Sequence, residues 1–185
     1  SHTYAAIGAY TATVTATNSV GSLVDQVAIL IHDVPIAGLA VTNSGPTPLG
    51  SSTLLTATIS AGTGAQYAWS FGDGQAGSGR TPSHQYAAVG TYTATVTATN
   101  SVGSSSAETV VAVAETISGL TATSSSPTVL HATTAFTATV AAGSGVNYLW
   151  AFGDGATGAA ATVSHVYGAV GTYIATVTAT NAVSV

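Results

Sequence analysis

The chain has 185 residues, of which 46% are hydrophobic and 4% charged, and its formal net charge is −5. It carries a single basic residue, Arg80, so it cannot neutralise a run of phosphates, which argues against nucleic acid as a partner. The absence of cysteine excludes disulfides, thiolate metal sites and thiol nucleophiles. The most apolar stretch, Val27–Ile31, is far too short for a membrane span.

Hydroxyl groups take the place of charge in this sequence. Threonine and serine number 32 and 21, and they alternate with alanine and valine along the chain. Such compositions are also typical of O-glycosylated segments, so glycans are candidate partners.

An internal repeat sets the domain organisation. His2, His84 and His165 are 82 and 81 residues apart, and Trp69 and Trp150 are 81 apart. The period of 81–82 residues predicts the C-terminal part of one repeat at 1–34, a complete repeat at 35–115, and a repeat lacking its last strand at 116–185. The extra residue of the first interval is predicted to be Pro35. The end repeats are completed either along a longer array or by strand exchange with a neighbour, and we favour the array.

Within the complete repeat, β-branched and aromatic runs are separated by Gly, Ser, Asn or Pro, and no helical period is visible. The predicted strands are Thr53–Ser60, Gln66–Phe71, Thr91–Thr99 and Ala107–Ala114. The FGDG segment at Phe71–Gly74 predicts a turn, with Asp73 bonding neighbouring amides. An all-β sandwich of about 80 residues follows.

Threonine recurs at every second position of the strand at 91–99. Because successive side chains of a strand point to opposite faces, the threonines share one face, and Tyr92, Ala94, Val96 and Ala98 share the core face. The predicted threonine face comprises Thr91, Thr93, Thr95, Thr97 and Thr99, with Thr172, Thr176, Thr178 and Thr180 in the third repeat. It is either a solvated surface or a face that packs in an assembly or carries sugars. One ladder per domain is too little for an ice-binding surface.

The pattern Y-x-W-x-F-G-D-G, followed by S-H-x-Y-x-x-x-G-x-Y-x-A-x-V-x-A-x-N, resembles the PKD (polycystic-kidney-disease) domain, an immunoglobulin-like sandwich. The pattern occurs at Tyr67–Asn100 and again at Tyr148–Asn181, so the resemblance covers nearly the whole chain. It implies a structural motif made of Trp69, Asp73, His84, Tyr92, Trp150, Asp154, His165 and Tyr173. Family members often carry Asp after the Trp, whereas this chain has Ser70 and Ala151, so an acidic role there is lost.

The sequence argues against catalysis and gives only a weak indication of metal binding. Ser83, His84 and Asp73 resemble a hydrolytic triad in type only, because adjacent Ser and His on an extended backbone point to opposite sides. Asp73 and Asp154 are weak calcium candidates, since calcium takes six to eight oxygen ligands and this sequence offers few carboxylates. We expect no enzyme activity and no cofactor.

The sequence therefore favours a structural component of an extracellular surface array or filament, built of tandem PKD-like domains that associate with copies of themselves. The alternative is a substrate- or cell-binding accessory module of a larger secreted enzyme or adhesin. Exposed aromatic side chains in a row would favour that alternative.

Overall fold

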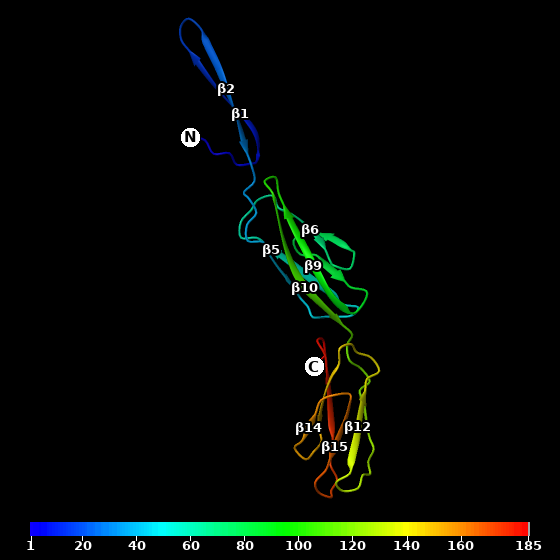
Figure 1. The fold of residues 1–185 in the computed structure, drawn as a ribbon. Coiled ribbons are helices and arrows are strands. Elements are labelled where there is room, and N and C mark those ends of the chain that lie inside the picture. The colour runs from blue at the N-terminus through cyan, green and yellow to red at the C-terminus, as the bar shows by residue number, and fades with distance from the viewer. Residues whose placement is uncertain (185) are drawn as a thin grey trace. The chain divides into compact units, whose positions relative to one another are not determined.

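The computed structural model describes residues 1–184, so the last residue of the predicted third repeat, Val185, lies outside the described part. Every regular element in residues 1–184 is a β-strand, and no helix there could cross a membrane. The strands form a hairpin and two sandwich-like repeats (Figure 1). The prediction of an all-β chain built of tandem repeats is confirmed.

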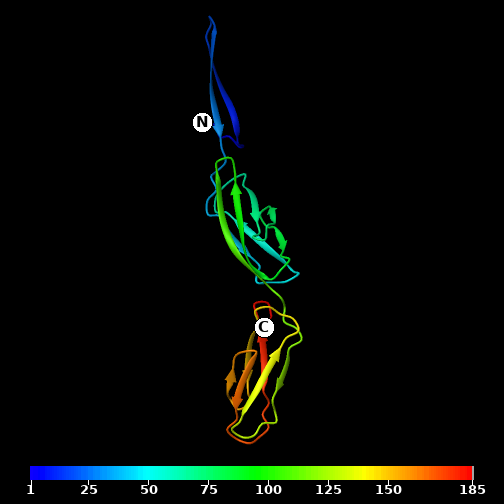
Figure 2. The same ribbon diagram turned by 45° about the vertical axis from the view of Figure 1, so that its right-hand side comes forward.

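The first element is an isolated hairpin of β1 (Gly8–Thr17) and β2 (Ser22–Ile31), drawn in blue in Figures 1 and 2. Its strands pair antiparallel from Gly8 opposite Ile31 to Thr17 opposite Ser22. The side chain of Val14 is 64% exposed here, whereas Val96, at the same position of the middle repeat, is fully buried. The hairpin therefore shows the local structure of the repeat without its core.

The middle repeat is made of two sheets. One has the order β4-β10-β9-β6-β7 and the other the order β3-β5-β8. The strands are β3 (Ala40–Asn43), β4 (Thr47–Pro48), β5 (Ser52–Thr58), β6 (Gln66–Ser70), β7 (Ala76–Ser78), β8 (Ser83–Gln85), β9 (Gly90–Thr99) and β10 (Ser104–Ala114). The long strands β9 and β10 run together in both views (Figures 1 and 2).

The core of the middle repeat comes from alternate positions of these strands. On β9 the side chains of Ala94, Val96 and Ala98 have no exposed surface, and on β5 the same holds for Leu55 and Ala57. The other core members, each less than a tenth exposed, are Trp69, Phe71, Tyr86, Val111 and Val113. Period-two alternation thus turns a chain rich in small residues into a closed core.

The third repeat has the same plan with fewer strands. Its sheets have the orders β11-β12-β15 and β14-β13-β16. The strands are β11 (Thr121–Ser124), β12 (Thr133–Thr139), β13 (Asn147–Ala151), β14 (Thr157–Gly158), β15 (Thr162–Val166) and β16 (Thr176–Thr180). Its core gathers around Phe136, Ala138, Trp150 and Phe152.

The structure corrects the predicted position of the extra residue. Val34 and Glu115 occupy the same place, because the Asn100 and Asn181 side chains donate to their carbonyl oxygens at 2.8 and 2.7 Å. Those two residues are 81 apart, as are the bridges that follow each of them. Repeat positions from His2 to Asn18 are 82 residues from their counterparts, so the extra residue lies before Val34 and is not Pro35.

Candidate functional site

The threonine face of the middle repeat lies on the five-stranded sheet. Thr91, Thr93 and Thr99 are exposed, and Thr95 and Thr97 are half-buried between neighbouring strands. Their side chains alternate with the buried Ala94, Val96 and Ala98. A β-branched side chain suits such a position, because it favours the strand while its hydroxyl remains on the surface.

Two hydrogen bonds join the threonine face to β10. The Thr95 hydroxyl donates to Glu108 Oε1 at 3.3 Å, and the hydroxyls of Thr97 and Ser106 lie 3.0 Å apart. The hydroxyls of the ladder centre are thereby held by neighbours on the same face. Cross-strand pairs of this kind stabilise a sheet and keep its surface even.

The strand on the other side of β9 continues this surface with uncharged side chains. Gln66, Ala68 and Ser70 of β6 lie directly opposite Thr99, Thr97 and Thr95, and all three are exposed. Next to them, β7 presents Ser78 and Ala76. Across these four strands, Glu108 is the single charged side chain.

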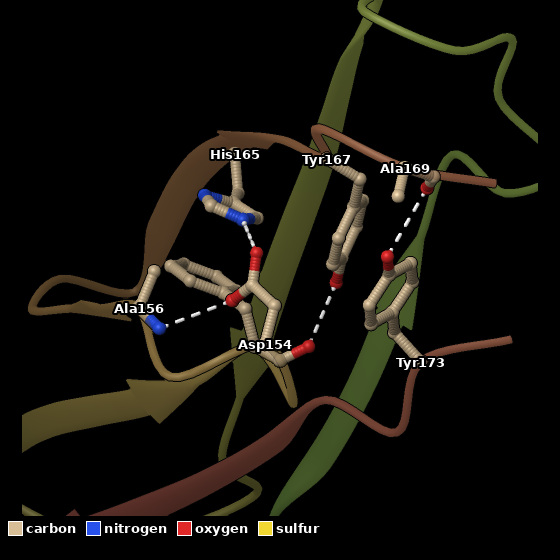
Figure 3. Close-up of polar contacts among 7 residues, drawn as sticks. Asp154, Ala156, His165, Tyr167, Ala169 and Tyr173 are labelled. Carbon is tan, nitrogen blue, oxygen red and sulfur yellow. Dashed lines mark hydrogen bonds and ion pairs between the residues drawn. The ribbon is translucent and has the colours of Figure 1, made fainter. Parts of the chain in front are cut away.

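The FGDG turn of the third repeat holds a compact polar cluster (Figure 3). Asp154 Oδ1 accepts the Ala156 amide at 3.0 Å, and Asp154 Oδ2 lies 2.6 Å from His165 Nε2. The His165 ring stacks on Phe152, with ring centres 4.4 Å apart and an interplanar angle of 1°. The bond from His165, followed by that from Ala156, lowers the pKa of the Asp154 carboxyl.

The tyrosines beside this cluster are bonded to the backbone. Tyr167 donates its hydroxyl to the Phe152 carbonyl at 3.0 Å, and burial raises the pKa of that hydroxyl. Its ring stacks on Tyr173, whose own hydroxyl donates to the Ala169 carbonyl at 3.1 Å (Figure 3). Both tyrosine hydroxyls shown in Figure 3 are therefore used to fix backbone carbonyls of a turn or a loop.

The middle repeat builds the same corner. Asp73 Oδ1 accepts the Gln75 amide at 3.0 Å, and the Tyr92 hydroxyl donates to Ala88 at 2.9 Å. The Tyr92 ring stacks on Tyr86, which packs edge-on against His84. His84 is only 9% exposed, so its ring belongs to the interior of the sandwich.

The adjacent Ser and His side chains of the motif point to opposite sides of their strands. On β8 the side chain of His84 is buried while the adjacent Ser83 is exposed on the opposite side, and β15 separates Ser164 from His165 in the same way. Within residues 1–184 no three His, Asp or Glu side chains gather to hold a metal ion. Asp73 and Asp154 instead cap their own turns, which is the chemistry that a carboxylate in an FGDG segment performs locally.

Each tryptophan is anchored in the same manner. Trp69 Nε1 donates to the Gly79 carbonyl at 2.9 Å, and Trp150 Nε1 donates to the Ala160 carbonyl at 3.1 Å. Both rings are almost fully buried in the sheets that carry β9 and β16. Two segments with this motif, residues 38–113 and 119–185, match the family model described as the PKD domain.

The chain belongs to the PKD domain family. It is 32% identical over 161 residues to polycystin-1 of Homo sapiens, a match that covers 84% of this chain and 4% of that protein. The PKD1 domain of Vibrio anguillarum Epp shares 24% identity at a TM-score of 0.35, covering 41% of this chain and 90% of that one. The PKD domain of human SorCS2 shares 25% identity at a TM-score of 0.40, covering 46% and 81%.

The middle and third repeats of the chain are its first and second PKD repeats. The second PKD repeat differs from the first in its threonine face. Thr176, Thr178 and Thr180 lie on β16, but Thr172 precedes this strand. In the first PKD repeat β9 lies between β6 and β10, whereas β16 pairs only with β13 in the described residues. Residues 171–175 have no such partner there, so the predicted strand face is shorter at that end.

Sequence reasoning missed a second role of the PKD motif. Asn100 and Asn181 close the motif in the two repeats, and their side chains contact the segment that enters each domain. The signal was present in the sequence, because an asparagine follows the threonine ladder in every repeat, at Asn18, Asn100 and Asn181. The contact itself joins residues 66 apart in the chain and was not visible from spacing.

Proposed function

We propose that this protein is a non-catalytic structural component of an extracellular array or filament, in which tandem PKD repeats pack laterally through their threonine faces. The observation that carries the proposal is the outer surface of β10, β9, β6 and β7, where uncharged side chains surround one carboxylate, Glu108. Most of them are Thr, Ser or Ala, and Gln66 and the exposed Val110 are the larger ones. Such a surface lets two copies approach closely without charge repulsion.

The internal bonding of this surface supports packing over free solvation. Thr95 and Thr97 are engaged by Glu108 and Ser106, so part of the ladder is already ordered before any partner arrives. Less side-chain entropy is then lost on association. The exposed hydroxyls of Thr91, Thr93 and Thr99 are the positions available to a second copy or to O-linked sugars.

The arrangement of aromatic residues gives less support to an accessory binding module. All thirteen Phe, Tyr and Trp residues lie in residues 1–184, and each is buried or half-buried. Tyr86 of the first PKD repeat is 1% exposed. A platform for polysaccharide or another cell surface needs aromatic faces open to the partner.

Electron microscopy of the native material, beside its intact mass, tests the proposal. Filaments or sheets are expected, and a mass above that of the polypeptide would place sugars on the hydroxyls. Particles that stay dispersed, or that are attached to a larger enzyme, would contradict it.

A matched pair of variants locates the packing face. Thr93→Lys places a charge on β9, and Thr58→Lys places the same charge at an exposed position of β5 in the other sheet. Assembly measured by sedimentation should be lost for Thr93→Lys and retained for Thr58→Lys. Equal loss in both variants would mean that net charge, and not this face, controls association.

A further inference from the structure

Asn100, which follows β9, forms hydrogen bonds to the segment that leads into the first PKD repeat. Asn100 Nδ2 donates to the carbonyl oxygens of Val34 and Thr63, at 2.8 and 2.9 Å. Asn100 Oδ1 accepts the amides of Val102 and Gly103, which closes the turn between β9 and β10. One side chain therefore ties the entering segment, the loop before β6 and this turn together.

A carboxylate strengthens the same contact. Asp33 is 9% exposed, and its two oxygens accept the hydroxyls of Thr63 and Ser101, both at 2.8 Å. These bonds, that of Ser101 first, lower the pKa of the Asp33 carboxyl. Gly64 makes room for it, since a Cβ at Gly64 would stand 2.8 Å from Asp33 Oδ1. The Val34 amide also donates to the Thr63 hydroxyl at 2.8 Å.

The second PKD repeat holds its entering segment in the same way with different residues. Asn181 Nδ2 donates to the carbonyls of Glu115 and Ser144 at 2.7 and 2.9 Å, and the Glu115 amide donates to the Ser144 hydroxyl at 2.8 Å. The Gly143 amide donates to the Glu115 carboxylate at 3.3 Å. We call these two sets of residues the linker clamps. The first consists of Asp33–Val34 with Thr63, Asn100 and Ser101, and the second of Glu115 with Gly143, Ser144 and Asn181.

The clamps leave almost no free chain between repeats. Strand β10 ends at Ala114, and the next residue, Glu115, is already bonded to the second repeat. After β2, which ends at Ile31, only His32 precedes the bonded Asp33. At the Glu115 junction no residue stands between β10 and the clamp, so backbone rotation there would break several hydrogen bonds together, which is not how a flexible linker behaves. At the Asp33 junction His32 is the one intervening residue.

We propose that the linker clamps are stiff junctions, through which each PKD repeat binds the last residues of the repeat before it and fixes its direction. The linker clamp that contains Asn181 thus binds an extended segment of the same chain. It contacts the backbone carbonyl oxygen and the side-chain carboxylate of Glu115. Tension applied to β10 passes directly into the bonds of Asn181 and Ser144. This inference concerns the junction within one chain and does not depend on lateral assembly.

Residual dipolar couplings of the full chain test the proposal. If the Glu115 junction is stiff, couplings from residues 38–113 and from 119–184 fit one alignment tensor. Asn181→Asp keeps the oxygen that accepts the turn amides but removes the donor to Glu115 and Ser144, so we expect loss of the common tensor. Ser144→Ala, which removes the hydroxyl acceptor of the Glu115 amide, should act in the same direction.

Asn18→Asp is the matched control. Asn18 caps the same turn through Oδ1, bonded to the amides of Val20 and Gly21, but the described residues give its Nδ2 no linker carbonyl. The control should keep the common tensor, and unchanged amide shifts in β12 and β13 would show that Asn181→Asp is still folded. Separate tensors in the unmodified chain, or one tensor in both clamp variants, would overturn the proposal.

Discussion

The imidazole of His165 lies face to face with the ring of Phe152 while its Nε2 is 2.6 Å from Asp154 Oδ2. Phe152 and Asp154 belong to the same FGDG turn, so one histidine contacts both its apolar and its acidic member. The carboxylate side chain is 23% exposed and that of His165 17% exposed, which leaves the pair accessible to protons from solvent. We therefore expect the packing of the second PKD repeat to depend on the charge of Asp154.

The first prediction concerns acid unfolding of this repeat. Because the pKa of Asp154 is lowered in the folded state, its carboxylate stabilises the fold at pH values above the ordinary Asp pKa of about 4. This contribution is lost as pH falls through the lowered pKa. The urea midpoint, followed by NMR amide signals of β12 and β13 from pH 7 to pH 2, should fall below about pH 4. Asp154→Asn should lower the midpoint at pH 7 and flatten the fall.

Asp25→Asn is the control for that experiment. Asp25 lies in the isolated hairpin, and its carboxylate accepts the amide of the next residue, Gln26. Its removal should leave the β12 and β13 profile unchanged. If the urea midpoint falls equally steeply below about pH 4 in Asp154→Asn and in the unmodified chain, other carboxylates control the acid unfolding.

The ladder shows which parts of this fold are predictable from sequence. Successive side chains of a strand point to opposite faces, so the alternation predicts burial directly. Thr93 lies on the outer face of β9 and is exposed, whereas Val96 lies on the inner face and is buried. The shortened β16 and the clamp of Val34 by Asn100 were not predictable, because each depends on contacts between residues far apart in the chain. The prediction of Pro35 as the extra residue was wrong for the same reason, because sequence spacing does not show which backbone carbonyl is hydrogen-bonded.

Two neighbouring leucines on β5 test the assignment of alternate side chains to the core face and the outer face. Leu55 is fully buried and Leu54 is 49% exposed. Leu55→Ala should destabilise the first PKD repeat by about 2–5 kcal/mol, through lost burial and the cavity left behind. Leu54→Ala should stay within about 0.5 kcal/mol, as is usual for surface substitutions. Urea unfolding monitored by NMR amide signals of β9 measures both, and similar costs would contradict the assigned core face.

A glycine facing an aromatic ring gives a second packing test. A Cβ added at Gly77 would stand 2.6 Å from Cζ of Phe71, a core side chain that is 3% exposed. Gly77→Ala should therefore overpack this edge of the sheet and cost about 1–3 kcal/mol. Gly103→Ala is the matched control, because nothing lies within 4 Å of its added Cβ. If both variants unfold at the same urea concentration, β7 must move aside without cost.

The hydroxyl of Tyr92 provides the last prediction. Its bond to the Ala88 carbonyl, at 2.9 Å, ties the loop before β9 to the strand itself. Tyr92→Phe keeps the ring stacked on Tyr86 but leaves that carbonyl without the hydroxyl, so the first PKD repeat should lose about 0.5–1.5 kcal/mol of unfolding free energy. The measurement is the urea midpoint from NMR amide signals of β9.

Tyr10 makes the equivalent bond in the hairpin, to the Ala6 carbonyl at 3.0 Å, outside the first PKD repeat. Tyr10→Phe should therefore leave the β9 midpoint unchanged, although the two substitutions remove the same atom. If the midpoint is also unchanged in Tyr92→Phe, ring stacking alone holds this corner of the repeat. The hydroxyl bond of Tyr92, which has equivalents at Tyr10 and Tyr173, would then contribute nothing to its stability.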